Sequence, residues 1–127
     1  MSELEGGGCS AKSPFALQVL GDSMEPEFRD GAVIIVDPNV PEFDGAYVVC
    51  DHNGETTLRQ FTIRGGRRML VALNERYPAE EINQSYLLRG VVTQQARNRR
   101  LGLKRAKHYE PQPPASATVT LNARSLI

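Results

Sequence analysis

The sequence predicts a mainly β, antiparallel domain with a short helical turn near its start. Apolar runs of five to eight residues, rich in Val and Ile, are separated by Asp-Gly, Asn-Gly and Gly-Gly turn signals. No long segment with helical periodicity occurs before residue 93. The 127 residues suit one domain. The strands expected in chain order are 15–20, 32–36, 46–50, 56–63, 68–73 and 86–92.

The first half of the chain supplies three of these strands. Residues 15–20 are apolar except for one glutamine, and Gly-Asp ends the run. The segment 23–28 is expected to form a turn and one helical turn. Residues 32–36 read Ala-Val-Ile-Ile-Val, which is typical of a buried strand, and Asp-Pro ends it. Residues 46–50 follow an Asp-Gly pair and are again apolar.

Turn chemistry defines the second half. The Asn-Gly pair at 53–54 is a strong hairpin signal between two strands. Residues 56–63 alternate in character, which places Arg59, Phe61 and Ile63 on one face, with Phe61 and Ile63 expected in the core. Gly-Gly at 65–66 turns the chain into 68–73, and 86–92 is the last expected strand.

The charge distribution is uneven, although the formal net charge is zero. Residues 1–96 hold 8 basic and 14 acidic side chains, a balance of −6, and residues 97–127 hold 7 and 1, a balance of +6. An acidic body therefore carries a basic end. We expect a flexible leader over 1–13, the folded domain over 14–96, and a mobile tail over 97–127 that is first basic and then Pro-rich.

Several classes of function are disfavoured. Two cysteines and two histidines show no metal-ligand spacing, so no metal or cofactor is expected. No apolar run reaches the roughly 20 residues that span a bilayer, and the acidic, Gly-rich beginning does not resemble a signal peptide. We therefore expect no membrane partner and a reducing, cytoplasmic location.

The most informative segment is GDSMEP at residues 21–26. Ser23 lies on a tight turn between a strand and a short helical turn, where its hydroxyl projects outward and the Met24 backbone N–H is a candidate oxyanion donor. Taken alone, Ser23 is more simply explained as a cap of the following helical turn. The longer pattern decides between these interpretations.

That longer pattern resembles the LexA/UmuD serine-peptidase family. It comprises GDSMEP at 21–26, Asp-Gly and an Ile/Val strand at 30–37, GETTLRQF at 54–61, LNERYP at 73–78 and RGVV at 89–92. The resemblance covers roughly residues 14–95, in order. It implies a LexA/signal-peptidase-like β domain in which a serine attacks a peptide bond and a neutral lysine accepts its proton. Signal peptidases share the Ser-Met-x-Pro start but are membrane-anchored.

The family pattern places its lysine where this chain has Arg59. An arginine side chain stays protonated in proteins and cannot accept the proton of Ser23. The lysines of the chain are Lys12, Lys104 and Lys107, all in the expected leader or tail. His52 is an alternative base, but a loop histidine is more often exposed and idle. A structural use of Arg59, a hydrogen bond to Ser23, is the favoured interpretation.

Two further departures concern the substrate and the DNA-binding half. The chain has no Ala-Gly or Cys-Gly pair, the bonds at which repressors of this type cut themselves. No helix-turn-helix segment precedes the expected domain. The chain resembles the trimmed form of UmuD more than an intact repressor.

Three hypotheses of function remain open. The first is a catalytically impaired LexA/UmuD-like domain that acts as a homodimeric interaction module in bacterial DNA-damage or phage-type regulation, with the RecA filament, a repressor or a translesion polymerase as partners implied by the resemblance. The second is an active serine peptidase that uses Ser23 with another base. The third is a nucleic-acid-binding accessory protein that uses the basic segment, whose cations are Arg97, Arg99, Arg100, Lys104, Arg105 and Lys107.

Overall fold

The computed structural model describes residues 12–109. Their strands form one antiparallel sheet in the order β2-β3-β8-β4-β5-β6-β7, with β9 paired to β8. The elements of the described chain, in order, are β2 (Phe15–Gln18), β3 (Val33–Asp37), β4 (Tyr47–His52), β5 (Glu55–Arg64), β6 (Arg67–Val71), β7 (Glu80–Glu81), β8 (Leu87–Gln95), the 3-10 helix η1 (Arg99–Leu101) and β9 (Lys107–His108). The mainly β, antiparallel prediction is confirmed.

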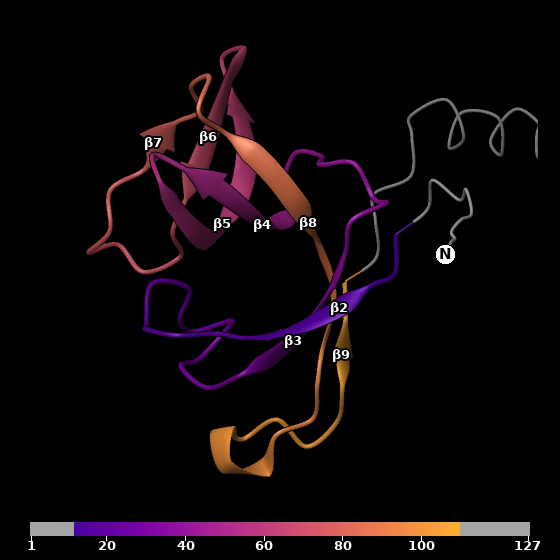
Figure 1. Ribbon diagram of the computed structural model, residues 1–127. Coiled ribbons are helices and arrows are strands. Elements are labelled where there is room, and N and C mark those ends of the chain that lie inside the picture. The colour runs from indigo at the N-terminus through magenta and orange to yellow at the C-terminus, as the bar shows by residue number, and fades with distance from the viewer. Residues whose placement is uncertain (1–11, 110–127) are drawn as a thin grey trace, which may run out of the picture.

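Strand β8 connects the two parts of the sheet. Figure 1 shows β4 to β7 curled together at one end of the molecule and β2, β3 and β9 at the other, with β8 running between them. β8 pairs with β3 through residues 91–95 and with β4 through residues 87–91. Gly90 lies where β8 passes β3, and a Cβ atom there would meet Val36 Cγ1 at 2.5 Å. The glycine therefore permits the close approach of these strands.

The two central strands are buried on both faces. Val48 and Val91 belong to one apolar cluster, which also contains Phe61 and Leu70. Their chain neighbours Val49 and Val92 belong to the other cluster. Successive side chains of a strand point to opposite faces, so β4 and β8 carry core residues on both sides. This explains why residues 46–50 form an unbroken apolar run.

The expected turns are present with the backbone that their residues favour. Asn53 and Gly54 have φ values of 53° and 84° and join β4 to β5. Positive φ at both central positions is the reason that Asn-Gly favours this type of hairpin. Ile63 differs from the prediction: Phe61 is buried, but Ile63 is 48 % exposed because it lies near the Gly65–Gly66 end of the β5–β6 hairpin.

The basic segment differs from the expectation of a mobile tail. Residues 97–109 form η1, a β-bridge between Asn98 and Leu103, and strand β9, which pairs with Gln94 and Gln95 of β8. Tyr109 then packs against the apolar core. The ordered fold therefore extends past residue 96. The Gly-rich part of the expected leader and the Pro-rich end, residues 1–11 and 110–127, lie outside the described residues.

Candidate active site

Ser23 lies on the irregular segment that connects β2 to β3. Gly21 precedes it with a φ of 91°, and the Gly21 N–H donates to Asp30 Oδ1 at 2.7 Å. After the serine, the Phe28 N–H donates to the Met24 carbonyl at 2.9 Å, which closes the single helical turn that the sequence predicts. Met24 and Phe28 are fully buried and anchor this turn in the core. Ser23 itself stays at the surface of a pocket.

A second segment fixes the serine turn from the other side. The Asn74 N–H donates to the Ser23 carbonyl at 3.0 Å, and Asn74 Nδ2 donates to the Asp22 carbonyl at 3.1 Å. The Tyr77 hydroxyl donates to Asp22 Oδ1 at 2.6 Å. Sequence reasoning included Asn74 and Tyr77 in a motif, LNERYP, but assigned them no role. Their role in the structure is to position the serine turn.

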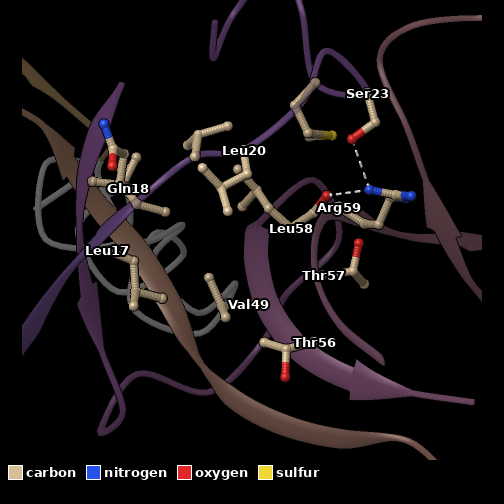
Figure 2. Close-up of a pocket in the computed structure, with 12 residues that line it drawn as sticks. Leu17, Gln18, Leu20, Ser23, Val49, Thr56, Thr57, Leu58 and Arg59 are labelled. Carbon is tan, nitrogen blue, oxygen red and sulfur yellow. Dashed lines mark hydrogen bonds between the residues drawn. The ribbon is translucent and has the colours of Figure 1, made fainter. Parts of the chain in front are cut away.

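Arg59 reaches the serine from β5. Its Nη1 donates to Ser23 Oγ at 2.9 Å and to the Leu58 carbonyl at 2.8 Å. The guanidinium carbon lies 5.8 Å from the centre of the Tyr77 ring, a distance compatible with a cation–π contact. The structure thus brings Ser23 and Arg59 together across 36 positions of the chain, as the sequence led us to expect (Figure 2).

The contact is electrostatically unlike that of a serine and a base. A protonated guanidinium has donors only, so Ser23 Oγ is the acceptor in this hydrogen bond. Among the described residues that line the pocket, Arg59 carries the only charge, and the others are aliphatic or neutral polar. Within residues 12–109, none of the three lysines lines this pocket. The described residues that line the pocket therefore present Ser23 with one cation, and none of them is a lysine, histidine, aspartate or glutamate.

His52 is placed differently from the expected idle, exposed loop residue. It ends β4, is 4 % exposed, and its Nδ1 lies 3.0 Å from Glu80 Oε1. It does not line the pocket beside Ser23. Its contact with Glu80 ties the short strand β7 to the end of β4, so the histidine has a structural environment of its own.

The backbone N–H of Met24 is the oxyanion donor that the sequence suggests. It follows Ser23 directly, and within the described residues it donates to no protein acceptor. An oxyanion hole requires such an N–H with no internal partner. The catalytic role of the Met24 N–H stays a prediction.

The pocket beside Ser23 has a volume of about 180 Å³. Figure 2 shows Leu17, Leu20 and Val49 on one side of it, and the Ser23–Arg59 pair on the other. Its lining is Leu17, Gln18, Val19, Leu20, Ser23, Met24, Ile34, Val49, Thr56, Thr57, Leu58 and Arg59. The pocket therefore has one apolar part and one part that carries hydrogen-bond donors.

The six cations of the basic segment lie on the connection from β8 to η1, on η1, on the loop that follows it and on β9. All six residues are exposed. Lys107 pairs with Glu27 at 2.6 Å, and within residues 12–109 the other five, Arg97, Arg99, Arg100, Lys104 and Arg105, make no ion pair. Figure 1 shows this orange loop at the opposite end of the molecule from the β5–β6 hairpin.

Comparison with known proteins identifies the family. Residues 7–93 match the family model described as Peptidase S24-like. The chain belongs to this family. The match covers more than half of the chain and contains both Ser23 and Arg59. The candidate site therefore lies within the S24-like domain.

Known relatives of this S24-like chain are regulators. It is 44 % identical over 87 residues to the HTH-type transcriptional regulator for conjugative element SXT of Vibrio cholerae, a match that covers 63 % of this chain and 40 % of the relative. It is 37 % identical over 94 residues to prophage repressor CohE of Escherichia coli, covering 71 % and 42 %. It is 39 % identical over 90 residues to repressor protein C2 of Salmonella phage P22, covering 66 % and 41 %. The match thus spans about two fifths of each relative.

Across residues 12–109, no group of three His, Cys, Asp or Glu side chains is arranged to hold a metal ion. The same residues contain no helix that is long and apolar enough to cross a membrane.

Proposed function

We propose that this S24-like domain is catalytically impaired and acts as a protein-interaction module in repressor-type regulation. The observation that carries the proposal is the hydrogen bond from Arg59 Nη1 to Ser23 Oγ at 2.9 Å. In a Ser-Lys dyad this position holds a neutral amine with a lone pair that removes the hydroxyl proton. A guanidinium has no such lone pair, and its charge is retained throughout the physiological pH range.

The rest of the peptidase scaffold supports an interaction role. The serine turn is held by Asn74 and Tyr77, the pocket is open, and the Met24 N–H is unpaired within the described residues. A ligand-binding surface therefore persists beside the impaired nucleophile. The family resemblance implies a homodimer, and the cysteine usage favours a cytoplasmic location. A repressor, the RecA filament and a translesion polymerase are the candidate partners that the family resemblance implies.

The proposal is tested by restoring the lysine. Wild-type protein, Arg59→Lys and the double variant Arg59→Lys with Ser23→Ala are incubated at alkaline pH, alone and with a supplied peptide, and fragments are measured by mass spectrometry. We expect no Ser23-dependent cleavage by the wild type. We expect Arg59→Lys to recover part of the roughly 10²- to 10⁴-fold acceleration that a general base supplies.

The alternative, an active peptidase with another base, makes the opposite forecast. A wild-type cut that disappears in Ser23→Ala would establish it and end the proposal of impairment. Absence of any recovery in Arg59→Lys, with the variant folded, would show that more than the base has diverged. Sedimentation equilibrium measures the dimer in the same samples, and a monomer at micromolar concentration would remove that part of the proposal.

A second candidate function is binding to nucleic acid through the basic loop. The observation that favours it is the group of five exposed cations between residues 97 and 105 that form no ion pair within the described chain. The backbone of this loop is closed at its base, because Asn98 and Leu103 exchange two backbone hydrogen bonds of 2.8 and 2.9 Å. A preformed cationic loop suits the phosphate backbone.

Salt dependence tests this second function. We expect duplex DNA to bind weakly at low salt. In a plot of the logarithm of the binding constant against the logarithm of the salt concentration, the steepness of the slope should fall by about 0.9 for each phosphate contact removed. Replacing Arg99, Arg100 and Lys104 with Gln removes three charges and leaves β9 in place. The matched control replaces Arg64, Arg67 and Arg68, on the β5–β6 hairpin, with Gln. Equal binding by both variants would exclude the basic loop as the contact.

A further inference from the structure

The guanidinium of Arg59 is only partly used. One nitrogen, Nη1, makes both of its hydrogen bonds, to Ser23 Oγ and the Leu58 carbonyl. Within residues 12–109, Nε and Nη2 donate to no acceptor, and no carboxylate forms an ion pair with Arg59. The side chain is half-buried beside the pocket. A guanidinium with two unused donors is the group best suited to bind a carboxylate through two parallel hydrogen bonds.

Two further donors adjoin this cation. Ser23 Oγ accepts from Arg59, so its own proton is free to be donated. The Met24 N–H, one residue further along, has no acceptor within the described chain. Arg59, Ser23 and Met24 thus line the same pocket, and none of the described residues that line it carries a negative charge. This set of donors is complementary to an anion.

The remainder of the pocket identifies the kind of anion. Leu17, Leu20, Val49 and Leu58 offer an aliphatic surface next to the donors, as Figure 2 shows. A phosphate group would leave this apolar surface unused, whereas an amino-acid residue carries both an aliphatic side chain and, at a chain end, a carboxylate. The pocket of about 180 Å³ has the size of a site for side chains rather than for a large cofactor.

The backbone around the pocket suits an extended peptide. Within residues 12–109, β2 is an edge strand whose one partner is β3. On β5, pairing with β6 begins at Gln60, so one edge of residues 55–59 has no partner strand within the described chain. Leu17 and Gln18 of β2 and residues 56–59 of β5 line the pocket from its two sides. Unpaired strand edges bind extended chains by adding a strand.

We propose that this pocket is a receptor for the C-terminal end of another polypeptide chain. The terminal α-carboxylate binds at Arg59, Ser23 and Met24, and an aliphatic side chain at the end of the peptide lies against Leu17, Leu20 and Val49. The inference rests on the proposed function, because it assigns to the impaired peptidase site the ligand that its new cation favours. At the position where the family has a lysine that accepts a proton, this chain has Arg59, which binds an anion.

The test compares peptides that differ only at the C-terminal group. Six-residue fluorescent peptides ending in Val or Leu are prepared as free acids and as amides, and binding is measured by fluorescence anisotropy. We expect the acids to bind at least tenfold more tightly than the amides, since the amide cannot form the charged pair with Arg59. A third peptide, amidated and ending in Glu, presents a side-chain carboxylate and is expected to bind like the other amides.

Variants locate the effect. Arg59→Gln is expected to bind acid and amide equally, and Arg67→Gln, which changes an exposed arginine of β6, is expected to keep the wild-type preference. Ser23→Ala provides a second variant that removes one donor without a change of charge, and it should weaken acid binding about tenfold or more, as loss of a hydrogen bond to a charged group does.

The outcomes separate this inference from the proposed function. Equal affinity of acid and amide for the wild-type protein, with no cleavage of either, overturns the receptor and leaves impairment standing. Binding of the Glu-ended amide as tightly as the acids overturns the assignment to a chain terminus. Cleavage of the peptides, followed by mass spectrometry in the same mixtures, instead counts against the proposed function itself.

Discussion

The hydroxyl of Tyr109 donates a hydrogen bond of 2.5 Å to Glu27 Oε2, across 82 positions of the chain. Glu27 belongs to the turn that carries Ser23, and its neighbour Phe28 packs against the Tyr109 ring with centroids 5.4 Å apart. Lys107 pairs with the same carboxylate oxygen at 2.6 Å. The end of the described chain and the serine turn therefore form one packed unit.

The first prediction concerns Tyr109 itself. Its hydroxyl also accepts from Gln95 Nε2 at 2.9 Å, and Gln95 is buried. We expect Tyr109→Phe to lower the free energy of unfolding by about 1–2 kcal/mol, because it removes a charged hydrogen bond and leaves polar groups less well paired. Urea unfolding monitored by circular dichroism gives the value. His108→Ala, an exposed neighbour on β9, is the control and should have a smaller effect.

The second prediction concerns the pH dependence of the same contact. Burial alone would raise the pKa of Glu27, but hydrogen bonds from Lys107 and Tyr109 outweigh it and hold the pKa below the ordinary value of 4.5. A carboxyl group whose pKa is lower in the folded state stabilises the protein above its unfolded pKa, and this contribution is lost as pH falls through the folded pKa.

Paired urea titrations of wild-type protein and Glu27→Gln measure this dependence. The stability difference between them should be constant from pH 7 to about pH 5 and should shrink as pH falls through 4.5 and below. A difference that stays the same down to pH 3 would show that the carboxylate charge contributes nothing at this position.

The third prediction concerns the buried thiol. Cys50 lies on β4 with no exposed surface, and burial raises its pKa to about 12. The thiolate is the reactive form, so Cys50 should be inert in the folded protein. In a Cys9→Ser background, Ellman's reagent should react with Cys50 only on the timescale of unfolding, and quickly once urea is added. Rapid reaction in the native protein would contradict the burial.

The fourth prediction concerns the crossing of β8 and β3. In Gly90→Ala the new methyl group would lie 2.5 Å from Val36 Cγ1 and 3.0 Å from the Asp37 carbonyl oxygen. Because one contact is with backbone, the strands must move apart, and we expect a loss of about 1–3 kcal/mol. Leu87→Ala, on the same strand but 57 % exposed, serves as the control in thermal unfolding and should have a much smaller effect.

Sequence reasoning was most successful where one local rule dominates. The Asn53–Gly54 hairpin and the strand expected at 32–36 follow from turn chemistry and from apolar β-branched residues, and both are present, although only alternate residues of β3 are buried. The proximity of Arg59 to Ser23 was inferred by a different route, the resemblance to a family. Periodicity alone does not bring together two residues that are 36 positions apart.

Sequence reasoning was least successful where distant contacts decide. Residues 97–109 carry many cations and no apolar period, so composition favours a mobile tail. Their order comes from a two-residue strand, one ion pair and a single aromatic ring, whose partners Glu27, Phe28 and Tyr47 are far away in sequence. The prediction that Ile63 lies in the core is wrong for a related reason. Strand alternation indicates which face a side chain is on, but not how far the core extends along the strand.

The hydrogen bond between Tyr109 and Glu27 has a practical consequence for truncated forms of this protein. A fragment cut before Lys107 would uncover the rings of Phe28 and Tyr47 and leave the Glu27 carboxylate without its cation. Damage of that kind, only four residues from Ser23, would look like a loss of ligand binding although no ligand contact had been touched. Substituting the cations of the basic segment, rather than removing the segment, avoids that artefact.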